Sequence, residues 1–443
     1  MQAVILAAGM GKRLKDLTKD STKCMVKVNG VTLIERMLCQ LDALKLSRIV
    51  IVIGYKAKTL VDFLKTLNIK TPVEFIENKD YETTNNIYSL YLARSTLLED
   101  DTLLLESDLI FEDSILDKLI NYPYPSLTLV ALYESWMDGT VVKIDADNRI
   151  KQFISKKDFD FSDISNYYKT VNIYKFSRKF SQTHYVPFLE AYQNALGKNE
   201  YYEQVLKVIV HLEQPEITAL PLSGEKWYEI DDIQDLDIAQ SIFSNDPEAQ
   251  LDAVSGRYGG YWRYPKMIDF CYLVNPFFPP DRMIEEIKAN FNRLIEAYPS
   301  GMRVNSLLAA KNFGVKQEHI VIGNGAAELI KAIPAIMDDN IGIVYPTFEE
   351  YPNRISKDKI IAFYPDNKDY RYTADDIIEF YNNKDVRALL IINPDNPTGN
   401  YIPMSDMEKL LDWTLRKNIR LILDESFADF SDEYSDALMG GGG

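Results

Sequence analysis

A loop near the start of the sequence combines two glycines with several cationic side chains. Gly9 and Gly11 follow a short apolar run, and glycine lets the backbone turn so that its N–H groups point at an anion. Lys12, Arg13 and Lys23 bring positive charge to the same part of the chain. These residue types in this order predict a binding site for a triphosphate.

Two well-known phosphate-binding loops fit this stretch poorly. A P-loop needs a glycine spacing that the sequence lacks, and a dinucleotide-binding loop needs a third glycine where Leu14 stands. The pattern Leu-x-Ala-Gly-x-Gly-x-Arg, followed by a lysine, instead resembles the signature loop of the sugar-phosphate and phosphocholine nucleotidyltransferases. A surface turn with solvated lysines is the alternative.

The resemblance implies roles for the residues of the loop. Arg13 and Lys23 would act in catalysis by stabilising charge on the phosphates. Relatives have a proline directly before the lysine, and proline restricts the backbone there. This chain has Thr22 at that position, so the restriction before Lys23 is lost. The expected nucleotide contacts in the loop are Leu6, Ala7, Ala8, Gly9, Met10 and Gly11.

Two acidic stretches suit a magnesium ion. Asp108 follows the apolar run 102–105, and a carboxylate there can hold Mg²⁺ against nucleotide phosphates, although an isolated acid is more often a helix cap or solvated. Glu229 and Asp231 face one side of an extended segment by alternation. The resemblance implies that Asp108, Asp231 and, less strictly, Glu229 bind the metal. Relatives carry Asp-x-Asp where this chain has Glu106, whose role stays open.

A polar loop at 77–86 is the expected base-recognition segment. Asn85 and Asn86 precede a predicted helix and are either two ordinary caps or contacts to cytosine. The sequence around them resembles the phosphocholine cytidylyltransferases, and this resemblance covers nearly all of residues 1–245. Gly54 and Ser107, which each follow a predicted strand, complete the expected nucleotide contacts.

The sequence pattern is less specific for the residues that bind the acceptor substrate. Relatives that bind a cationic amine use aromatic rings and carboxylates, which attract an ammonium group. Most of the candidates here fit a hydrophobic core or a solvated helix face equally well. They are Tyr88, Trp136, Asp138, Tyr174, Tyr201, Tyr202 and Glu203.

The elements that must position these residues alternate between strand and helix. Strands are predicted at 4–7, 48–53, 73–76 and 102–105, with helical spacing at 31–46, 57–67 and 87–98. This order predicts an α/β fold with a doubly wound, Rossmann-like mixed sheet of the nucleotidyltransferase type. Ligands in such sheets bind beyond the carboxyl ends of the strands, and the candidate site residues follow the predicted strands at these ends.

Composition narrows the class of protein. A chain of 443 residues has room for two or three domains, and no apolar run approaches the ~18 residues of a membrane span. A net charge of −17 argues against a general nucleic-acid binder. Scattered cysteines and histidines predict neither disulfides nor a zinc site. With no signal peptide before the first strand, we expect a cytoplasmic protein without membrane insertion.

A second α/β unit follows a glycine- and aromatic-rich stretch. We expect domains at 1–245 and 267–443, joined by a linker or docking arm at 246–266. Motifs around Gly323, Tyr345, Asn393 and Leu423 together resemble the fold-type I pyridoxal-phosphate aminotransferases. This resemblance implies pyridoxal phosphate contacts from Gly325, Ala326 and Ala327 to the phosphate, Tyr351 and Asn396 to the ring, and Asp424 to the ring nitrogen.

The aminotransferase half lacks the lysine that would form a Schiff base with the cofactor. Relatives have their Schiff-base lysine after the aspartate, yet the last lysine here is Lys417, before Asp424. We therefore expect a truncated domain that is inactive and holds pyridoxal phosphate weakly or not at all.

The two resemblances together suggest a function. Fusion is advantageous when the product of one domain is the substrate of the other. An aminotransferase of this kind would form 2-aminoethylphosphonate. We therefore expect the first domain to be a Mg²⁺-dependent cytidylyltransferase that couples CTP to 2-aminoethylphosphonate. Phosphocholine is the alternative acceptor, and a non-catalytic nucleotide-sensing module is the alternative class. A homodimer through the aminotransferase half is a further expectation.

Overall fold

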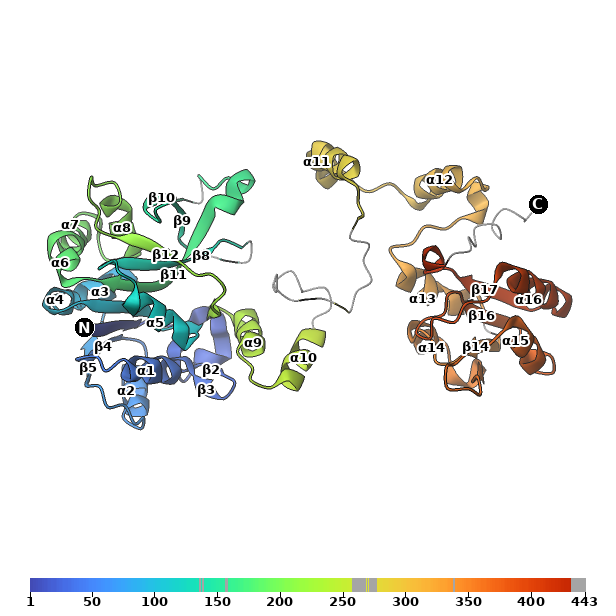
Figure 1. Ribbon diagram of the computed structural model, residues 1–443, viewed down its shortest axis with the longest axis horizontal. Coiled ribbons are helices and arrows are strands. Elements are labelled where there is room, and N and C mark those ends of the chain that lie inside the picture. The colour runs from blue at the N-terminus through green and yellow to red at the C-terminus, as the bar shows by residue number, and fades with distance from the viewer. Residues whose placement is uncertain are drawn as a thin grey trace. The chain divides into compact units, whose positions relative to one another are not determined.

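The chain forms two compact units. The computed structural model describes residues 1–134, 137, 139–155, 158–256, 268, 270, 277–337 and 339–431. Backbone contacts divide the chain into Met1–Tyr272 and Leu273–Gly443 (Figure 1). The domain limits expected from the sequence, 245 and 267, stay predictions.

A mixed nine-stranded sheet forms the centre of the first unit. Its main path runs β10-β9-β11-β6-β1-β4-β5, with β8 beside β11 and β12 beside β8. β1 lies parallel to β4 and β6, whereas β11 is antiparallel to β6. The strands are β1 (Gln2–Ala7), β4 (Ile49–Ile53), β5 (Val73–Glu77), β6 (Thr102–Glu106), β8 (Leu127–Leu132), β9 (Val141–Ile144), β10 (Ile150–Ile154), β11 (Tyr167–Phe176) and β12 (Thr218–Pro221).

Two short strand pairs complete the first unit. β7 (Leu109–Phe111) pairs antiparallel with β13 (Trp227–Glu229), and β2 (Lys27–Val28) pairs with β3 (Val31–Thr32). Because β7 begins three residues after β6 ends, this pairing brings the chain around residue 229 to the carboxyl end of β6. The predicted metal residues come from these two segments.

Helices cover both faces of the sheet. Side chains alternate along β1, so each face of the sheet presents apolar residues to a different set of helices. Ala3, Ile5 and Ala7 face a core shared with α1, α2 and α5, while Val4 and Leu6 face a core shared with α3, α4, α7 and α8 (Figure 1). This confirms the doubly wound α/β fold. The helices are α1 (Leu33–Ala43), α2 (Ala57–Leu64), α3 (Asn86–Leu92), α4 (Arg94–Glu99), α5 (Asp113–Asn121), α6 (Arg178–Phe180), α7 (Val186–Leu196), α8 (Glu203–Ile209), α9 (Ile233–Ile242) and α10 (Pro247–Ser255).

The helix boundaries differ from the sequence-based expectation in two places. The helix expected at 87–98 is divided into α3 and α4 at Ala93. The stretch expected as a linker begins with α10, which starts at Pro247 after the capping side chain of Asp246. Residues 257–266 of that stretch lie outside the described residues.

The second unit contains a four-stranded parallel sheet in the order β15-β14-β16-β17. Hydrophobic clusters pack on it, one of them with α15 and α16. Its strands are β14 (Ile341–Val344), β15 (Ile360–Phe363), β16 (Ala388–Ile392) and β17 (Arg420–Asp424). Its helices are α11 (Asp281–Glu296), α12 (Met302–Phe313), α13 (Ala326–Ile336), α14 (Glu350–Arg354), α15 (Ala374–Tyr381) and α16 (Met404–Lys417).

None of the helices within the described residues combines the length and hydropathy needed to cross a bilayer.

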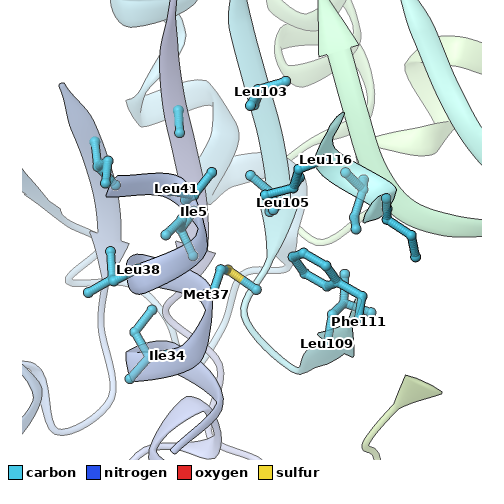
Figure 2. Close-up of a cluster of buried hydrophobic side chains, with 14 of the residues drawn as sticks. Ile5, Ile34, Met37, Leu38, Leu41, Leu103, Leu105, Leu109, Phe111 and Leu116 are labelled. Carbon is cyan, nitrogen blue, oxygen red and sulfur yellow. The ribbon is translucent and has the colours of Figure 1, made fainter. Parts of the chain in front are cut away.

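The core between α1 and the central strands should carry much of the stability of the first unit. Leu103 is fully buried there and belongs to the same hydrophobic cluster as Leu41 and Ile5 (Figure 2). We expect Leu103→Ala to lower the free energy of unfolding by about 2–5 kcal/mol, because the cavity left behind adds to the lost burial. Hydrogen exchange of the β1 and β6 amides along a urea series measures this change.

The matched control is Leu196→Ala at the end of α7, where the leucine is 64% exposed. This change should stay within about 0.5 kcal/mol. Equal losses in the two variants would contradict the assignment of this core.

Candidate active site

A cavity of about 660 Å³ lies at the carboxyl ends of the central strands of the first unit. Residues at the ends of β1 and β6 line it, as expected for a doubly wound sheet. The structure brings most of the predicted residues together in this one cavity. Those that line it are Leu6, Ala7, Ala8, Gly9, Gly11, Arg13, Lys23, Asn85, Asn86, Ser107, Asp108, Tyr201, Glu203, Glu229 and Asp231.

The glycine loop owes its shape to a close approach. Gly11 has φ +61°, and a Cβ there would lie 3.0 Å from Cβ of Lys23 and 3.1 Å from Cγ2 of Thr18. Thr18 also donates a hydrogen bond to the Gly11 carbonyl at 3.0 Å. Any side chain at position 11 would therefore push Lys23 out of place.

Gly54 supports this loop from behind and is not among the residues that line the cavity, so its contact with the nucleotide stays a prediction. A Cβ at Gly54 would lie 2.9 Å from both Cβ and the carbonyl oxygen of Ala8. The next residue, Tyr55, donates its backbone N–H to the same carbonyl. Met10 is also absent from the described lining of the cavity.

Lys23 connects the two predicted metal-binding aspartates. Its Nζ lies 2.5 Å from Oδ2 of Asp108 and 2.7 Å from Oδ1 of Asp231, and Arg13 contacts the same Asp231 oxygen at 2.7 Å. Burial alone would lower the pKa of Lys23, but the two carboxylates outweigh it and raise that pKa. Burial likewise opposes ionisation of Asp231, yet Lys23 and Arg13 hold its pKa below the usual range. Both partners are therefore charged at neutral pH.

The pairing of β7 with β13 places these acids. Glu229 pairs with Leu109, and the N–H of Ile230 donates to the Asp108 carbonyl at 3.0 Å. The capping box at the start of α9 fixes the next residues, since Asp235 accepts from the N–H of Asp231 at 3.0 Å. Residues distant in sequence thus converge at one point.

Ligand oxygens of Asp108, Glu229 and Asp231 lie within 4.8 Å of one another. Oδ1 of Asp108 is buried and has no hydrogen-bond partner among the described residues. An unsatisfied carboxylate oxygen beside two further carboxylates fits a hard cation such as Mg²⁺, which prefers oxygen ligands. The residues present therefore suit the metal that the motifs imply.

Glu229 is held on its far side by two residues of β11. Its Oε2 accepts from Lys169 at 3.0 Å and its Oε1 from Asn172 at 3.3 Å. Lys169 is 2% exposed and donates also to the Thr170 carbonyl. Burial raises the pKa of Glu229, although Lys169 opposes the rise. Because both oxygens have protein partners, Glu229 is less available to a metal than the two aspartates.

Asn172 reaches Glu229 through an irregularity in β11. The register with β8 shifts between Thr170 and Tyr174, and Asn172 has φ +60°, which is rare outside glycine. Such a bulge redirects side chains along a strand.

Two further carboxylates, Glu106 and Glu203, lie at the cavity. Glu106 stands outside the group of three potential metal ligands and accepts a hydrogen bond from Asn86 at 3.0 Å. Asn86 in turn accepts from the N–H of Tyr202, just before α8. Burial raises the pKa of Glu203 to about 7.

The asparagine pair has structural partners. Asn85 caps α3 by accepting from the N–H of Asn86, and Asn86 joins Glu106 to the start of α8. The side-chain amide of Asn85 donates to no partner within the part of the chain that the structure describes, whereas Asn86 is engaged at both ends. Base recognition by either residue stays a prediction.

Three of the aromatic acceptor candidates lie outside the described lining of the cavity. Tyr174 and Tyr202 are fully buried and pack edge to face at 5.7 Å in the hydrophobic core, so they are not cavity residues. Tyr88 stacks on Tyr91 outside the described lining. Tyr201 lines the cavity. Trp136 and Asp138 lie outside the described residues.

Several lining residues have no counterpart in the sequence-based prediction. Lys169 and Asn172 lie within a strand, where only their interruption of an apolar pattern would have revealed them. Asn78, Tyr81 and Thr84 lie in the polar loop 77–86 that was expected to recognise the base, but they were not singled out. The lining residues outside any predicted site segment include Ser89, Thr140, Lys169, Asn172, Gln204 and Lys207.

In the second unit, the expected cofactor residues follow strand ends or begin a helix. The hydroxyl of Tyr351 donates to Oδ2 of Asp424 at 2.7 Å, and the N–H of Asn393, in the loop that carries Asn396, donates to the Asp424 carbonyl. Gly325, with φ +82°, precedes Ala326 and Ala327 at the start of α13. A helix N-terminus and a carboxylate beside an aromatic ring fit the phosphate and ring nitrogen of pyridoxal phosphate.

Comparison with known proteins agrees with this division. Residues 3–141 match the MobA-like NTP transferase domain, and residues 265–439 match the aminotransferase class I and II family. The CMP-5'-(3-aminopropyl)phosphonate synthase of Streptomyces rubellomurinus is 29% identical over 97% of this chain and 68% of its own length.

Two shorter relatives match the first unit. The choline-phosphate cytidylyltransferase of Streptococcus pneumoniae is 27% identical over 56% of this chain and its whole length. The 2-aminoethylphosphonate cytidylyltransferase of Lancefieldella rimae is 37% identical over 25% of this chain and 44% of its own length. The chain is therefore a fusion of a nucleotidyltransferase domain with an aminotransferase class I and II domain, which confirms the fusion indicated by its motifs.

Proposed function

We propose that the first unit is a Mg²⁺-dependent cytidylyltransferase that couples CTP to 2-aminoethylphosphonate. A phosphonate oxygen attacks the α-phosphorus of CTP, the bond to pyrophosphate breaks, and CMP-2-aminoethylphosphonate forms. The observation that supports this most strongly is the contact of Lys23 with both Asp108 and Asp231 beneath the glycine loop. Cations, carboxylates and the backbone of the glycine loop meet there, as a triphosphate and its metal require.

Each group then has a distinct task. The loop around Gly9 and Gly11 orients the phosphates, and Lys23 and Arg13 stabilise the charge that develops on them. Asp108 and Asp231 would hold Mg²⁺, which supplies Lewis-acid neutralisation of phosphate oxygens. Positioning and electrostatics account for the rate, so no covalent intermediate on the protein is needed.

The acceptor is inferred from the fusion and from the relatives. A relative that aligns with almost the whole chain is named for an aminoalkylphosphonate, and another relative is named for 2-aminoethylphosphonate itself. Tethering a transaminase, which forms primary amines, raises the local concentration of such an acceptor. Phosphocholine is the second candidate, supported by the cytidylyltransferase that aligns over its whole length.

The first test concerns catalysis itself. We expect the protein to release pyrophosphate from CTP only when 2-aminoethylphosphonate and Mg²⁺ are present. Asp108→Asn should lower kcat by at least 100-fold, because it removes a charged metal ligand. Asp117→Asn, an exposed change on α5, is the matched control and should have no effect. A nucleotide-sensing module would instead show no turnover in the wild type, and full turnover in Asp108→Asn would contradict the metal assignment.

The second test concerns the nucleotide. Asn85 can donate amide hydrogens to the acceptor atoms O2 and N3 of cytosine, whereas uracil and thymine carry a proton on N3. We expect kcat/KM for CTP to exceed that for UTP, dTTP and ATP at least tenfold, about 1.4 kcal/mol in the transition state. Parallel pyrophosphate assays with the four nucleotides measure this. Equal or better use of UTP or dTTP would refute CTP as the substrate.

The third test concerns the aminotransferase domain. The 443 residues contain no lysine after Lys417, so we propose that this polypeptide binds pyridoxal phosphate weakly and without a covalent link. Its spectrum with added pyridoxal phosphate should lack the absorbance of a lysine-linked aldimine, and borohydride should fix no cofactor to the protein. A fixed cofactor together with transaminase turnover would show that another lysine serves.

A further inference from the structure

We propose that Glu203 and Glu106 form a binding site for the primary ammonium group of the acceptor, and that this site rejects a quaternary ammonium. The proposal rests on the proposed function and adds the residues that select the acceptor's amine. It gives a role to Glu106, the position at which this chain departs from the Asp-x-Asp pattern of its relatives.

Glu203 offers a hydrogen-bond acceptor that the protein does not use. Its side chain lines the cavity, the residue is only 5% exposed, and its buried Oε2 has no partner among the described residues. Buried carboxylate oxygens are nearly always hydrogen-bonded, so an unsatisfied one on a residue that lines a cavity indicates that a ligand supplies the donor. The ligand must therefore carry N–H or O–H groups.

Glu106 supplies a second acceptor, which is held in place by Asn86. The Nδ2 of Asn86 donates to Oε1 of Glu106 at 3.0 Å, and its Oδ1 accepts from the N–H of Tyr202, the residue before Glu203. One asparagine thus ties the end of β6 to the start of α8. This arrangement leaves Oε2 of Glu106 without a hydrogen bond from Asn86.

The charges nearby favour a cation. Glu203 faces Lys169, Lys207 and Glu229, but Lys169 already donates to Glu229 and to the Thr170 carbonyl. Glu106 faces Asp108, Glu203, Glu229 and Lys23, and Lys23 is bound to the two aspartates. Lys207 remains near Glu203, whereas Glu106 shares its one nearby lysine with two aspartates, so an ammonium group beside Glu106 would add the cation that this carboxylate lacks.

Hydrogen-bond geometry then decides which ammonium fits. A primary ammonium donates three hydrogen bonds, enough for both glutamates, whereas a trimethylammonium donates none and would leave both carboxylates buried and unsatisfied. A quaternary group is usually held by aromatic faces. Tyr174 and Tyr202 are buried in the core, so the aromatic rings in the described lining are Tyr81, on the loop before α3, and Tyr201, which is 56% exposed. The described lining therefore suits the primary amine.

The wild-type protein provides the first test. Pyrophosphate release is measured with CTP, Mg²⁺ and 2-aminoethylphosphonate, its N-methyl, N,N-dimethyl and N,N,N-trimethyl derivatives, and ethylphosphonate, which lacks the amine. We expect kcat/KM to fall with each methyl group and to be at least tenfold lower for the trimethyl derivative. Equal or better use of the trimethyl derivative would overturn the proposal.

Isosteric variants provide the second test, with binding measured by calorimetry so that turnover is not required. Glu203→Gln and Glu106→Gln should each weaken binding of 2-aminoethylphosphonate at least tenfold and leave that of ethylphosphonate within twofold. Glu213→Gln, at an exposed position after α8, is the matched control and should change neither. Thermal unfolding confirms that each variant is folded.

The outcomes separate the two claims. If no acceptor supports pyrophosphate release but 2-aminoethylphosphonate still binds through the two glutamates, the proposed function fails and the ammonium site stands. If the wild type turns over 2-aminoethylphosphonate while both glutamine variants bind it normally, or lose both ligands equally, the ammonium site is wrong and the proposed function stands.

Discussion

The ion pair of Lys23 with Asp108 and Asp231 is the interaction on which the organisation of the first unit depends. These residues come from the segment after the glycine loop, the end of β6 and the end of β13, so the contact requires all three to be in register. Gly11 permits it because no Cβ pushes Lys23 away, and the capping box of α9 permits it because it fixes Asp231. Both local features therefore help to form the contact of Lys23 with the two aspartates.

Electrostatics explain why the contact is formed by several cations. The chain carries a net charge of −17, so a triphosphate approaches against an unfavourable overall field. Lys23 and Arg13 bring positive charge to the phosphate loop and are held there by Asp231. A nucleotide and its metal would exchange these ion pairs for new ones, which costs less than bringing isolated charges into a partly buried cavity. The site is therefore prepared for both an anion and a cation.

The sequence predicted those features that depend on local chemistry. The glycine loop, Asp108 and Asp231 follow strands directly, so their place at the carboxyl edge of the sheet followed from the order of elements. Tyr174 lies in the core because the face of a residue in β11 depends on the shift between Thr170 and Tyr174, and Tyr202 lies there because it begins the buried face of α8, and no sequence pattern reveals either. Gly54 was assigned to the nucleotide because a glycine after a strand cannot disclose whether a ligand or the Ala8 backbone lies against it. The partners of Glu229 are long-range contacts and were likewise beyond prediction.

The central claim is that Asp108 and Asp231 form a cation site at which Lys23 and a metal compete. It is tested most directly by Mn²⁺ binding without nucleotide, followed by electron paramagnetic resonance in the wild type, Lys23→Met and Asp108→Asn. Removing the lysine leaves the carboxylates uncompensated, so Lys23→Met should bind Mn²⁺ at least tenfold more tightly than the wild type, and Asp108→Asn more weakly. Unchanged or weaker binding by Lys23→Met would contradict the account.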